Sequence, residues 1–513
     1  MKALPVELLS VIFNFVQANA GKDKRDLASC SLVSRLWRQI TLPQLFAELH
    51  ICYSVEDGSS SDLSEAETEQ GEGEACQERY YHNLVNETDG ADSDSAIPGW
   101  CRGTTPPVSL HSVIAFLKHK KDIAFFVRSF ALKQNDKDGD VQLTNAETLF
   151  LTINQLPSLR NLELINVDVG EDCQPSLKLV ANRDLDCLSI DLYHASYYGQ
   201  ASSPESIIYI LSFFRSINAL SLTGIYLDES DGIVTNSRLS LHALNCKHLE
   251  LWSVHPLDTF ISMMQSDSLQ NIETLLVDHS GYGAIQLLVD DTEYGGAQVL
   301  EGLLAKACAN LLHLTLRTGE LLSPLYFCFP AERVFVIASG DFLDGSRGTL
   351  LYPLCRLQTL RLIIKIISYL PCIAYWSDAV HLLSSVRAHS TLHTIILEVK
   401  VEVEKEAMRM HHDDVSASIT RLDDLLLSLA TTGGSVKQVV LAFEDGRVGG
   451  RQHPFHDVIS CFGDVFPKLR ENDILKLVGF NQACHVLCAL FLSDIGLISA
   501  LVVNISTRSR CLF

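Results

Sequence analysis

The run DKDGD at residues 136–140 is the part of the sequence closest to a metal-binding loop, since calcium loops place acidic residues around a central glycine. Such a loop needs carboxylate ligands at its first and twelfth positions. With Gly139 at the sixth position, Gln134 falls at the first and Asn145 at the twelfth. The spacing therefore favours a polar turn over a calcium site.

A second polar cluster, HHDD, occupies residues 411–414. Adjacent residues on a helix point in different directions, so we interpret His411, His412, Asp413 and Asp414 as a solvated face. The sequence contains no phosphate-binding glycine loop, nucleophile elbow or H-E-x-x-H zinc motif. We therefore predict no metal site, no cofactor and no catalytic residue, and we expect a protein that is not an enzyme.

Cysteine usage indicates the compartment of the protein. The 15 cysteines are scattered, their number is odd, and no two are spaced as C-x-x-C. This distribution favours neither a zinc framework nor a secreted disulfide scaffold. The N-terminal run MKALPVELL contains Pro5 and Glu7, which interrupt any signal-peptide core. A reducing compartment, cytoplasmic and/or nuclear, is therefore expected.

Negative charge is concentrated in one segment. The chain of 513 residues has a formal net charge of −22, and residues 54–97 carry thirteen acidic residues against one basic residue, Arg79. Such a segment buries too little apolar area to offset its ordering entropy, which predicts a disordered insertion. Ser61 and Ser64 suit acidophilic kinases, but an unmodified spacer is the favoured interpretation. The overall charge argues against nucleic-acid binding.

The first fifty residues have the apolar periodicity of two short helices. Pro5 and Glu7 suit a first helical turn, and residues 18–25 form a polar break before Asp26, a good N-cap. If residues 27–40 form one helix, its apolar arc spans about 200°, roughly twice what a surface helix needs. Two helices this short cannot enclose that surface, which predicts a partner chain; the alternative is a cap that packs on its own chain.

These residues resemble the F-box in order and spacing. The resemblance rests on three runs: Leu4-Pro5-x-Glu7-Leu8-Leu9-x-x-Ile12-Phe13, Asp26-Leu27-x-Ser29-Cys30-x-Leu32-Val33-Ser34-Arg35-x-Trp37-Arg38, and Leu42-Pro43-Gln44-Leu45-Phe46. It implies that residues 1–50 form a helical module that docks on a Skp-type adaptor and, through it, on a cullin. The residues implied to bind the adaptor are Leu4, Pro5, Glu7, Leu8, Ile12, Leu32, Val33 and Trp37.

A strand template, apolar-x-x-apolar-x-apolar, recurs from residue 127 onwards, and its intervening positions are usually polar, as half-exposed strands require. Its ten occurrences are Val127-Phe130-Leu132, Leu159-Leu162-Leu164, Leu185-Leu188-Ile190, Ile217-Leu220-Leu222, Cys246-Leu249-Leu251, Ile272-Leu275-Val277, Leu311-Leu314-Leu316, Leu357-Leu360-Leu362, Leu392-Ile395-Leu397 and Val436-Val439-Leu441. Helical patterns lie near or between them at 108–120, 206–217 and 379–389.

One strand and one helix every 26 to 46 residues is typical of a leucine-rich-repeat solenoid. We therefore predict an α/β fold: a small all-α F-box, then parallel strands with helices in a leucine-rich-repeat-like solenoid over 98–480. This combination is similar to fungal-type F-box proteins with degenerate repeats. The alternative is an α/β domain whose strands do not repeat.

Two details refine the repeat prediction. Phe46-Leu49-Ile51 also fits the template, so the insertion 54–97 interrupts the first repeat. Three residues beyond the template, where the family consensus has Asn or Cys, only Asn135 complies. Four other repeats carry Val167, Tyr193, Ile225 and Val254 there, which predicts an irregular solenoid.

The C-terminal segment 481–513 contains an apolar stretch, 483–503, that is long enough to span a bilayer. Asp494 near its centre would cost about 2.5–3.5 kcal/mol on insertion scales, and His485 weakens the stretch further. A buried or poorly specified tail is the favoured interpretation, with membrane insertion as the alternative.

Together these features predict a substrate-recognition subunit of a Skp–cullin–F-box ubiquitin ligase, in which the repeats bind a protein substrate of unknown identity. The alternative is an interaction scaffold that acts outside ubiquitin transfer. The substrate is expected on the concave sheet and the loops leaving its strands. The candidate substrate-binding residues, chosen as good interface anchors, are Tyr193, Tyr226, Trp252, His255, His279 and Arg317.

Overall fold

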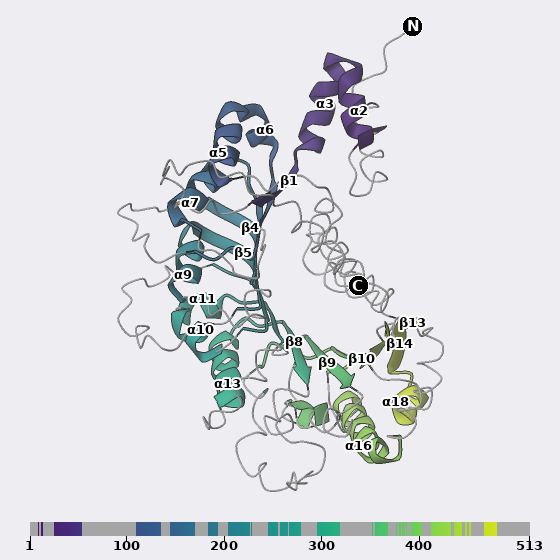
Figure 1. The fold of residues 1–513 in the computed structure, drawn as a ribbon. Coiled ribbons are helices and arrows are strands. Elements are labelled where there is room, and N and C mark those ends of the chain that lie inside the picture. Colours follow the sequence, from purple (N-terminus) through teal and green to yellow (C-terminus); the bar gives the residue numbers. More distant parts are fainter. Residues whose placement is uncertain are drawn as a thin grey trace, which may run out of the picture.

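The structure is a computed structural model (Figure 1). It describes residues 9, 12–13, 25–53, 109–134, 144–169, 183–192, 204–225, 227, 245–254, 257–264, 266–278, 295–318, 351, 354–367, 376, 379–380, 382–384, 386, 391–402, 412–431, 435–443, 447–448, 451–452 and 466–479. The predicted insertion 54–97, the run DKDGD and the tail 481–513 lie outside the described residues.

The second of the two helices predicted in the N-terminal region is two helices in the structure. Helix α2 (Arg25–Val33) ends before Ser34, and α3 (Arg35–Leu45) begins after it. Ser34 has extended backbone angles, and its hydroxyl accepts the Trp37 backbone N–H at 3.2 Å, so it caps α3. The prediction of a single helix across 27–40 was therefore wrong, and its apolar residues divide between two helices that pack against one shared small core.

The described part of this region has a small core of its own. Leu9, Phe13 and Leu27 are buried together, and Trp37 and Ile40 pack partly against them. The rings of Phe13 and Trp37 meet edge to face, with centroids 5.1 Å apart. The helices are thus held by contacts between the first apolar run and the second.

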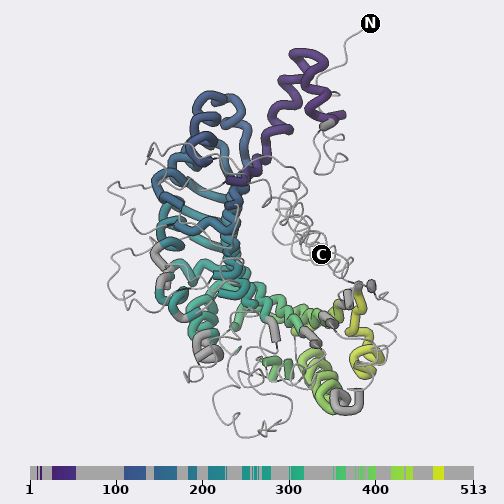
Figure 2. Tube along the Cα trace, in the orientation of Figure 1, coloured from purple at the N-terminus to yellow at the C-terminus, as the bar shows by residue number. Residues whose placement is uncertain are grey.

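A 12-stranded parallel sheet follows, with its strands in chain order (Figures 1 and 2). Its strands are β1 (Glu48–Tyr53), β2 (Ser129–Gln134), β3 (Asn161–Ile165), β4 (Arg183–Asp191), β5 (Phe214–Thr223), β6 (His248–Trp252), β7 (Thr274–Asp278), β8 (His313–Thr318), β9 (Thr359–Ile367), β10 (Thr394–Glu402), β11 (Gln438–Phe443) and β14 (Leu475–Gly479). A short antiparallel pair, β12 (Arg447–Val448) and β13 (Arg451–Gln452), lies outside this sheet.

Described helices lie in seven of the connections between neighbouring strands: β1 to β2, β2 to β3, β4 to β5, β6 to β7, β7 to β8, β10 to β11 and β11 to β14. They are α5 (Leu110–His119), α6 (Lys121–Phe126), α7 (Ala146–Asn154), α9 (Pro204–Ser212), α10 (Leu257–Met263), α11 (Ser266–Gln270), α13 (Gly295–Ala307), α16 (His412–Thr431) and α18 (Pro467–Glu471). The sheet turns through an arc, and these helices lie on its convex side (Figures 1 and 2). We call the opposite, concave side the inner face. The predicted α/β class is confirmed.

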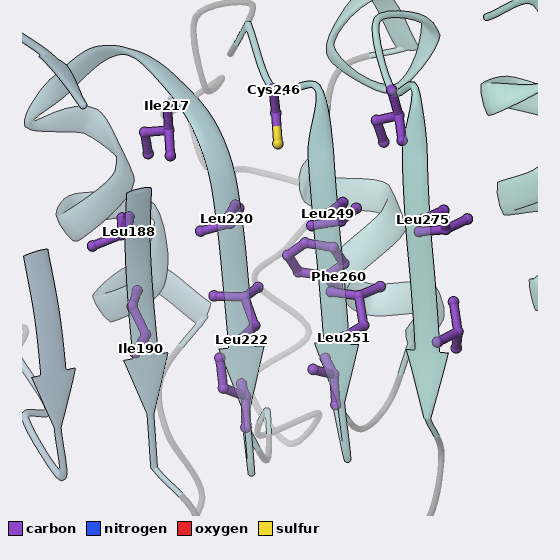
Figure 3. Close-up of a cluster of buried hydrophobic side chains, with 14 of the residues drawn as sticks. Leu188, Ile190, Ile217, Leu220, Leu222, Cys246, Leu249, Leu251, Phe260 and Leu275 are labelled. Carbon is purple, nitrogen blue, oxygen red and sulfur yellow. The ribbon is translucent and has the colours of Figure 1, made fainter. Parts of the chain in front are cut away.

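Every template segment forms a strand of this sheet. None of the apolar template residues from Val127 to Leu441 is more than 5% exposed, and they point toward the helices. Figure 3 shows this layer on neighbouring strands, with Leu220, Leu249 and Leu275 side by side and Phe260 of α10 packed against them. Burying each such side chain contributes about 1.5–3 kcal/mol, and a one-residue slip would expose the whole set. The template therefore determines the register.

The final strand, β14, escapes the template. Its Leu475 and Leu477 align with Val439 and Leu441 of β11, but Asn472 occupies the position where the template has its first apolar residue. The strand forms through its pairing with β11 although Asn472 breaks the template, and Asn472 is exposed directly after α18.

The helix predicted over 206–217 is too long. Helix α9 ends at Ser212, and residues from Phe214 onwards form β5, which pairs with β4 from Arg183. An apolar run does not distinguish a buried helix from a buried strand, and here the neighbouring strand decides between them.

A shared turn closes three of the strands. Asn166, Gly224 and Ser253 directly follow β3, β5 and β6 and have φ between 53° and 62°. Each donates its backbone N–H to the neighbouring strand at 2.7–2.8 Å, which extends the ladder by one bond. The next residues, Val167, Ile225 and Val254, are buried. These apolar residues, which depart from the family consensus, thus pack into the core.

Candidate partner-binding surfaces

The N-terminal helices expose a group of aliphatic side chains. Leu32 is 84% exposed, Val33 63%, Ile12 45% and Leu36 40%, and they make up most of the large exposed apolar side chains among the described residues. Leu32 and Val33 end α2 and Leu36 begins α3, so the break at Ser34 collects them at one corner. Exposed aliphatics gathered in this way make the corner a candidate interaction surface.

The other residues implied to bind the adaptor divide into two groups. Trp37 is half-buried against Phe13, and its carbonyl accepts the Thr41 hydroxyl at 2.9 Å, so it contributes to the internal core of the helices. Leu4, Pro5, Glu7 and Leu8 lie outside the described residues. Leu36 is exposed beside Val33 but was not among the predicted site residues. Its place two residues after the capping serine is the signal that could have identified it.

The inner face of β3–β6 carries a polar row. The register places Glu163, Ser189, Ser221 and Glu250 next to one another on successive strands. The Ser221 hydroxyl donates to Glu250 Oε2 at 3.3 Å, and the Trp252 indole N–H donates to the same oxygen at 3.4 Å. The indole ring is thereby oriented while remaining half-buried, as an interface anchor must be.

The predicted substrate-binding residues are only partly visible. Trp252 lies on the inner face of β6, in the same row as Thr223 and Asp278. The backbone of Arg317 lies in β8 opposite Ile363, and the description does not extend to its side chain. Tyr193, Tyr226, His255 and His279 lie outside the described residues.

The inner face of β9, β10, β11 and β14 contains buried residues that the sequence did not predict there. Arg361 Nε donates to Glu398 Oε2 at 2.7 Å, and the Glu398 side chain is 1% exposed. Beside this ion pair, Ile396, Val440, Ala442 and Val478 form a buried apolar cluster, separate from the helix-side core. We call these four residues the inner patch. The sequence does contain a signal for this ion pair. Arg361 lies inside the template of β9, and the oppositely charged Glu398 directly follows the template of β10.

The two positions that fail the calcium spacing have structural roles. Gln134 is buried and accepts the Tyr53 hydroxyl at 3.1 Å, whereas Asn145 caps α7 by accepting the Thr148 N–H at 3.1 Å. Among the described residues, no group of three or more His, Cys, Asp or Glu side chains could hold a metal ion. Burial raises the pKa of the Cys246 thiol to about 12, so that sulfur is a packing atom rather than a nucleophile.

Within the described part of the chain, no helix is both long and apolar enough to cross a membrane. Comparison with curated proteins gives no match to the chain. Comparison with protein families gives a match to the model described as F-box-like, over residues 1–52. The matched region includes α2, α3 and most of β1, so the first strand of the sheet directly continues the F-box-like domain.

Proposed function

We propose that this protein is a substrate-recognition subunit of a Skp–cullin–F-box ubiquitin ligase and is not itself an enzyme. The F-box-like domain binds a Skp-type adaptor, and the adaptor joins the chain to a cullin. The observation that carries the proposal is the exposed corner of Leu32, Val33 and Leu36 inside a region that matches the F-box-like family. Such a corner is stabilised when a partner removes it from water.

The sheet region is, in this proposal, an irregular leucine-rich-repeat-like solenoid that holds a protein substrate. Its support is the chain-order pairing of parallel strands, most of them with a buried template, and the described helices that lie together on one side of the sheet. The inner face of β3–β6, with its half-buried polar and aromatic side chains, is then the part of the sheet that holds the substrate. Trp252, oriented by Glu250, is its best described anchor.

The test of adaptor binding uses the full-length chain and purified Skp-type adaptor. Leu32→Asp and Val33→Asp place a charge on exposed positions, so the fold is retained while the apolar contact is lost. We expect affinity to fall at least tenfold, which corresponds to about 1.4 kcal/mol. The matched control is Phe125→Asp, at a 61% exposed aromatic on α6 outside the F-box-like region.

Affinity that is unchanged in both aspartate variants would contradict the docking proposal. Co-purification followed by mass spectrometry gives the second readout: an adaptor together with a cullin supports ligase assembly. A captured protein without either of them would instead support a scaffold that acts outside ubiquitin transfer.

A further inference from the structure

The inner face of β3–β7 carries charges of one sign. The register aligns three inner-face residues of each strand in rows: Asn161, Cys187, Ala219, His248 and Thr274; Glu163, Ser189, Ser221, Glu250 and Leu276; and Ile165, Asp191, Thr223, Trp252 and Asp278. These fifteen described residues include four carboxylates and no lysine or arginine. Burial lowers the pKa of His248, so its imidazole adds no positive charge at neutral pH. We call Glu163, Asp191, Glu250 and Asp278 the acidic strip.

Neither composition nor the sheet imposes this single sign. Outside residues 54–97 the chain is only mildly acidic. At the amino edge of the same strands both signs occur together, as in the pair of Lys247 and Glu273, whose charged atoms are 3.1 Å apart. The inner face also accepts uncharged residues, since Leu276 is the register partner of Glu250. Like charges gathered on one face repel one another, and a bound cation relieves that repulsion.

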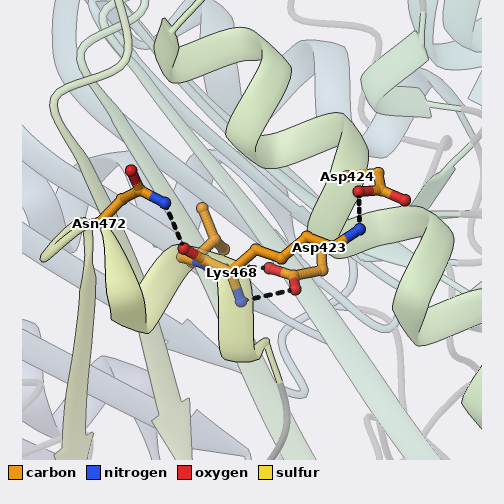
Figure 4. A network of polar contacts seen from close by, with 5 residues as sticks. Asp423, Asp424, Lys468 and Asn472 are labelled. Carbon is orange, nitrogen blue, oxygen red and sulfur yellow. Dashed lines mark hydrogen bonds and ion pairs between the residues drawn. The ribbon is translucent and has the colours of Figure 1, made fainter.

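Two carboxylates of α16 show what a structural role looks like by comparison. Asp423 is buried and accepts the backbone N–H groups of Lys468 and Leu469 at 3.0 and 3.2 Å, which caps α18. Its neighbour Asp424 pairs with the ammonium group of Lys468 (Figure 4). These carboxylates join two helices through positively charged or backbone donors, whereas the side-chain donors that orient Glu250 are uncharged.

Trp252 lies among the carboxylates of the acidic strip. Its indole N–H donates to Glu250 Oε2 at 3.4 Å, and the Ser221 hydroxyl donates to the same oxygen at 3.3 Å. Because both donors are neutral, they orient the carboxylate without cancelling its charge. On the neighbouring strand, Asp278 is the register partner of Trp252. A cation over the indole ring would therefore be attracted by the ring and by the carboxylates together.

Basic residues mark the two margins of the acidic strip. Lys133 of β2 is the register partner of Ile165, and Arg317 of β8 follows Leu316, which pairs with Val277. The four carboxylates still outnumber these two bases across β2–β8. From β3 to β7 the strip is about 19 Å wide, since adjacent strands are about 4.8 Å apart, and roughly six extended residues of a partner chain span that width.

We propose that the inner face of β3–β7 binds a basic segment of a protein substrate, with one Lys or Arg side chain over the ring of Trp252 and others against the acidic strip. The inference rests on the proposed function and names the chemistry of its substrate. The carboxylates are buried or half-buried, so salt screens them less than fully exposed charges. The same face repels acidic segments, so charge also selects against such partners.

The experiment measures by fluorescence anisotropy how the full-length chain binds labelled peptides of about 12 residues, whose extended length of about 40 Å exceeds the width of the strip. One peptide alternates Lys with Ser, and two others carry Glu or Gln in place of Lys. We expect the Lys peptide to bind most tightly. No binding of the Lys peptide, or tighter binding of either other peptide, would overturn the proposal.

Two double variants then locate the binding. Glu163→Gln with Asp191→Asn leaves Trp252 and Glu250 in place and should weaken binding of the Lys peptide about fivefold. The matched control, Asp186→Asn with Glu273→Gln, removes the same number of charges at the amino edge and should leave the affinity nearly unchanged. An equal loss in both double variants would mean that general charge attraction, and not the inner face, holds the peptide.

A second measurement uses the unmodified chain, in case the variants do not fold. In hydroxyl-radical footprinting, saturating Lys peptide should lower the oxidation of Trp252 several-fold and leave that of Phe125 on α6 unchanged. Unchanged oxidation of Trp252 in the presence of bound peptide would overturn the proposal.

Failure of this inference is distinguishable from failure of the proposed function, because adaptor binding is measured at the exposed corner. If the adaptor binds and the Lys peptide does not, only the chemistry of the substrate is wrong. If the Lys peptide protects Trp252 and the adaptor does not bind, the inner face binds basic segments and the ligase assignment is wrong.

Discussion

Strands β3–β6 and strands β9–β14 use the same buried template on the helix side, yet their inner faces differ. The first group presents the half-buried Glu163, Glu250 and Trp252, with the buried Ser221 hydroxyl bonded to Glu250. The second presents the inner patch and an ion pair whose Glu398 is almost inaccessible. The template is shared by both groups, so it does not distinguish the more open part of the inner face from the more buried part.

The comparison also shows how electrostatic contacts depend on their surroundings. In the open part, Arg215 and Asp184 form a pair in which both side chains are at least half exposed. In the closed part, Arg361 and Glu398 form a pair from which water is largely excluded. The exposed pair contributes little because water screens it, whereas breaking a buried pair leaves an uncompensated charge and costs more.

The largest expected effect separates the two inner faces directly. Ile396→Asp should lower the free energy of unfolding by about 3–5 kcal/mol, because it buries an unpaired charge. Leu276→Asp, at a half-buried position of the same face, should cost no more than about 1–2 kcal/mol. Urea denaturation measures both. Equal losses would mean that the two faces are not different environments.

The next effect compares the two ion pairs. Glu398→Ala should cost about 3 kcal/mol because Arg361 would lose its partner in a closed environment. Asp184→Ala, which removes the exposed partner of Arg215, should cost less than about 1 kcal/mol. The same denaturation experiment applies. A smaller loss at Glu398 than at Asp184 would contradict the assignment of a closed face.

A third prediction tests whether the open part of the inner face binds a partner protein. Trp252→Ala should weaken capture of a co-purified protein partner at least tenfold, or about 1.4 kcal/mol, while adaptor binding is unchanged. Phe125→Ala on α6 is the control for an exposed aromatic on the convex side. If partner capture falls more in the α6 variant than in Trp252→Ala, the binding surface lies on the helices instead.

The smallest effect is a dependence on pH. Hydrogen bonds from Arg215 and then Ser216 hold the pKa of Asp184 below its ordinary value. A lowered folded-state pKa adds stability that is fully present above the unfolded pKa of about 3.9 and is lost as the pH falls through the folded value. In the Asp184→Asn variant, the free energy of unfolding should therefore fall slightly less steeply below about pH 4. If it falls equally steeply in both proteins, the pair contributes nothing to stability.

The core side of the sheet was predictable because it depends on local patterning. Each template predicts one buried layer, and eleven strands follow from residues no more than six apart. The exception, β14, shows the limit: Asn472 breaks the pattern, and pairing with β11 still forms the strand. Leu32 and Val33 of the exposed corner were among the predicted site residues. Leu36 was not, because its exposure depends on the break between α2 and α3, which the sequence pattern did not predict.

By itself, the sequence determined the α/β class, the helix-facing layer and the F-box-like region, because all three rest on spacing within short segments. The tertiary structure decided where α2 ends, how Glu250 orients Trp252, and which part of the inner face is closed. A half-polar strand looks the same in sequence whether water or another segment covers it. Burial on that face depends on contacts between residues far apart in the chain, which local periodicity does not encode.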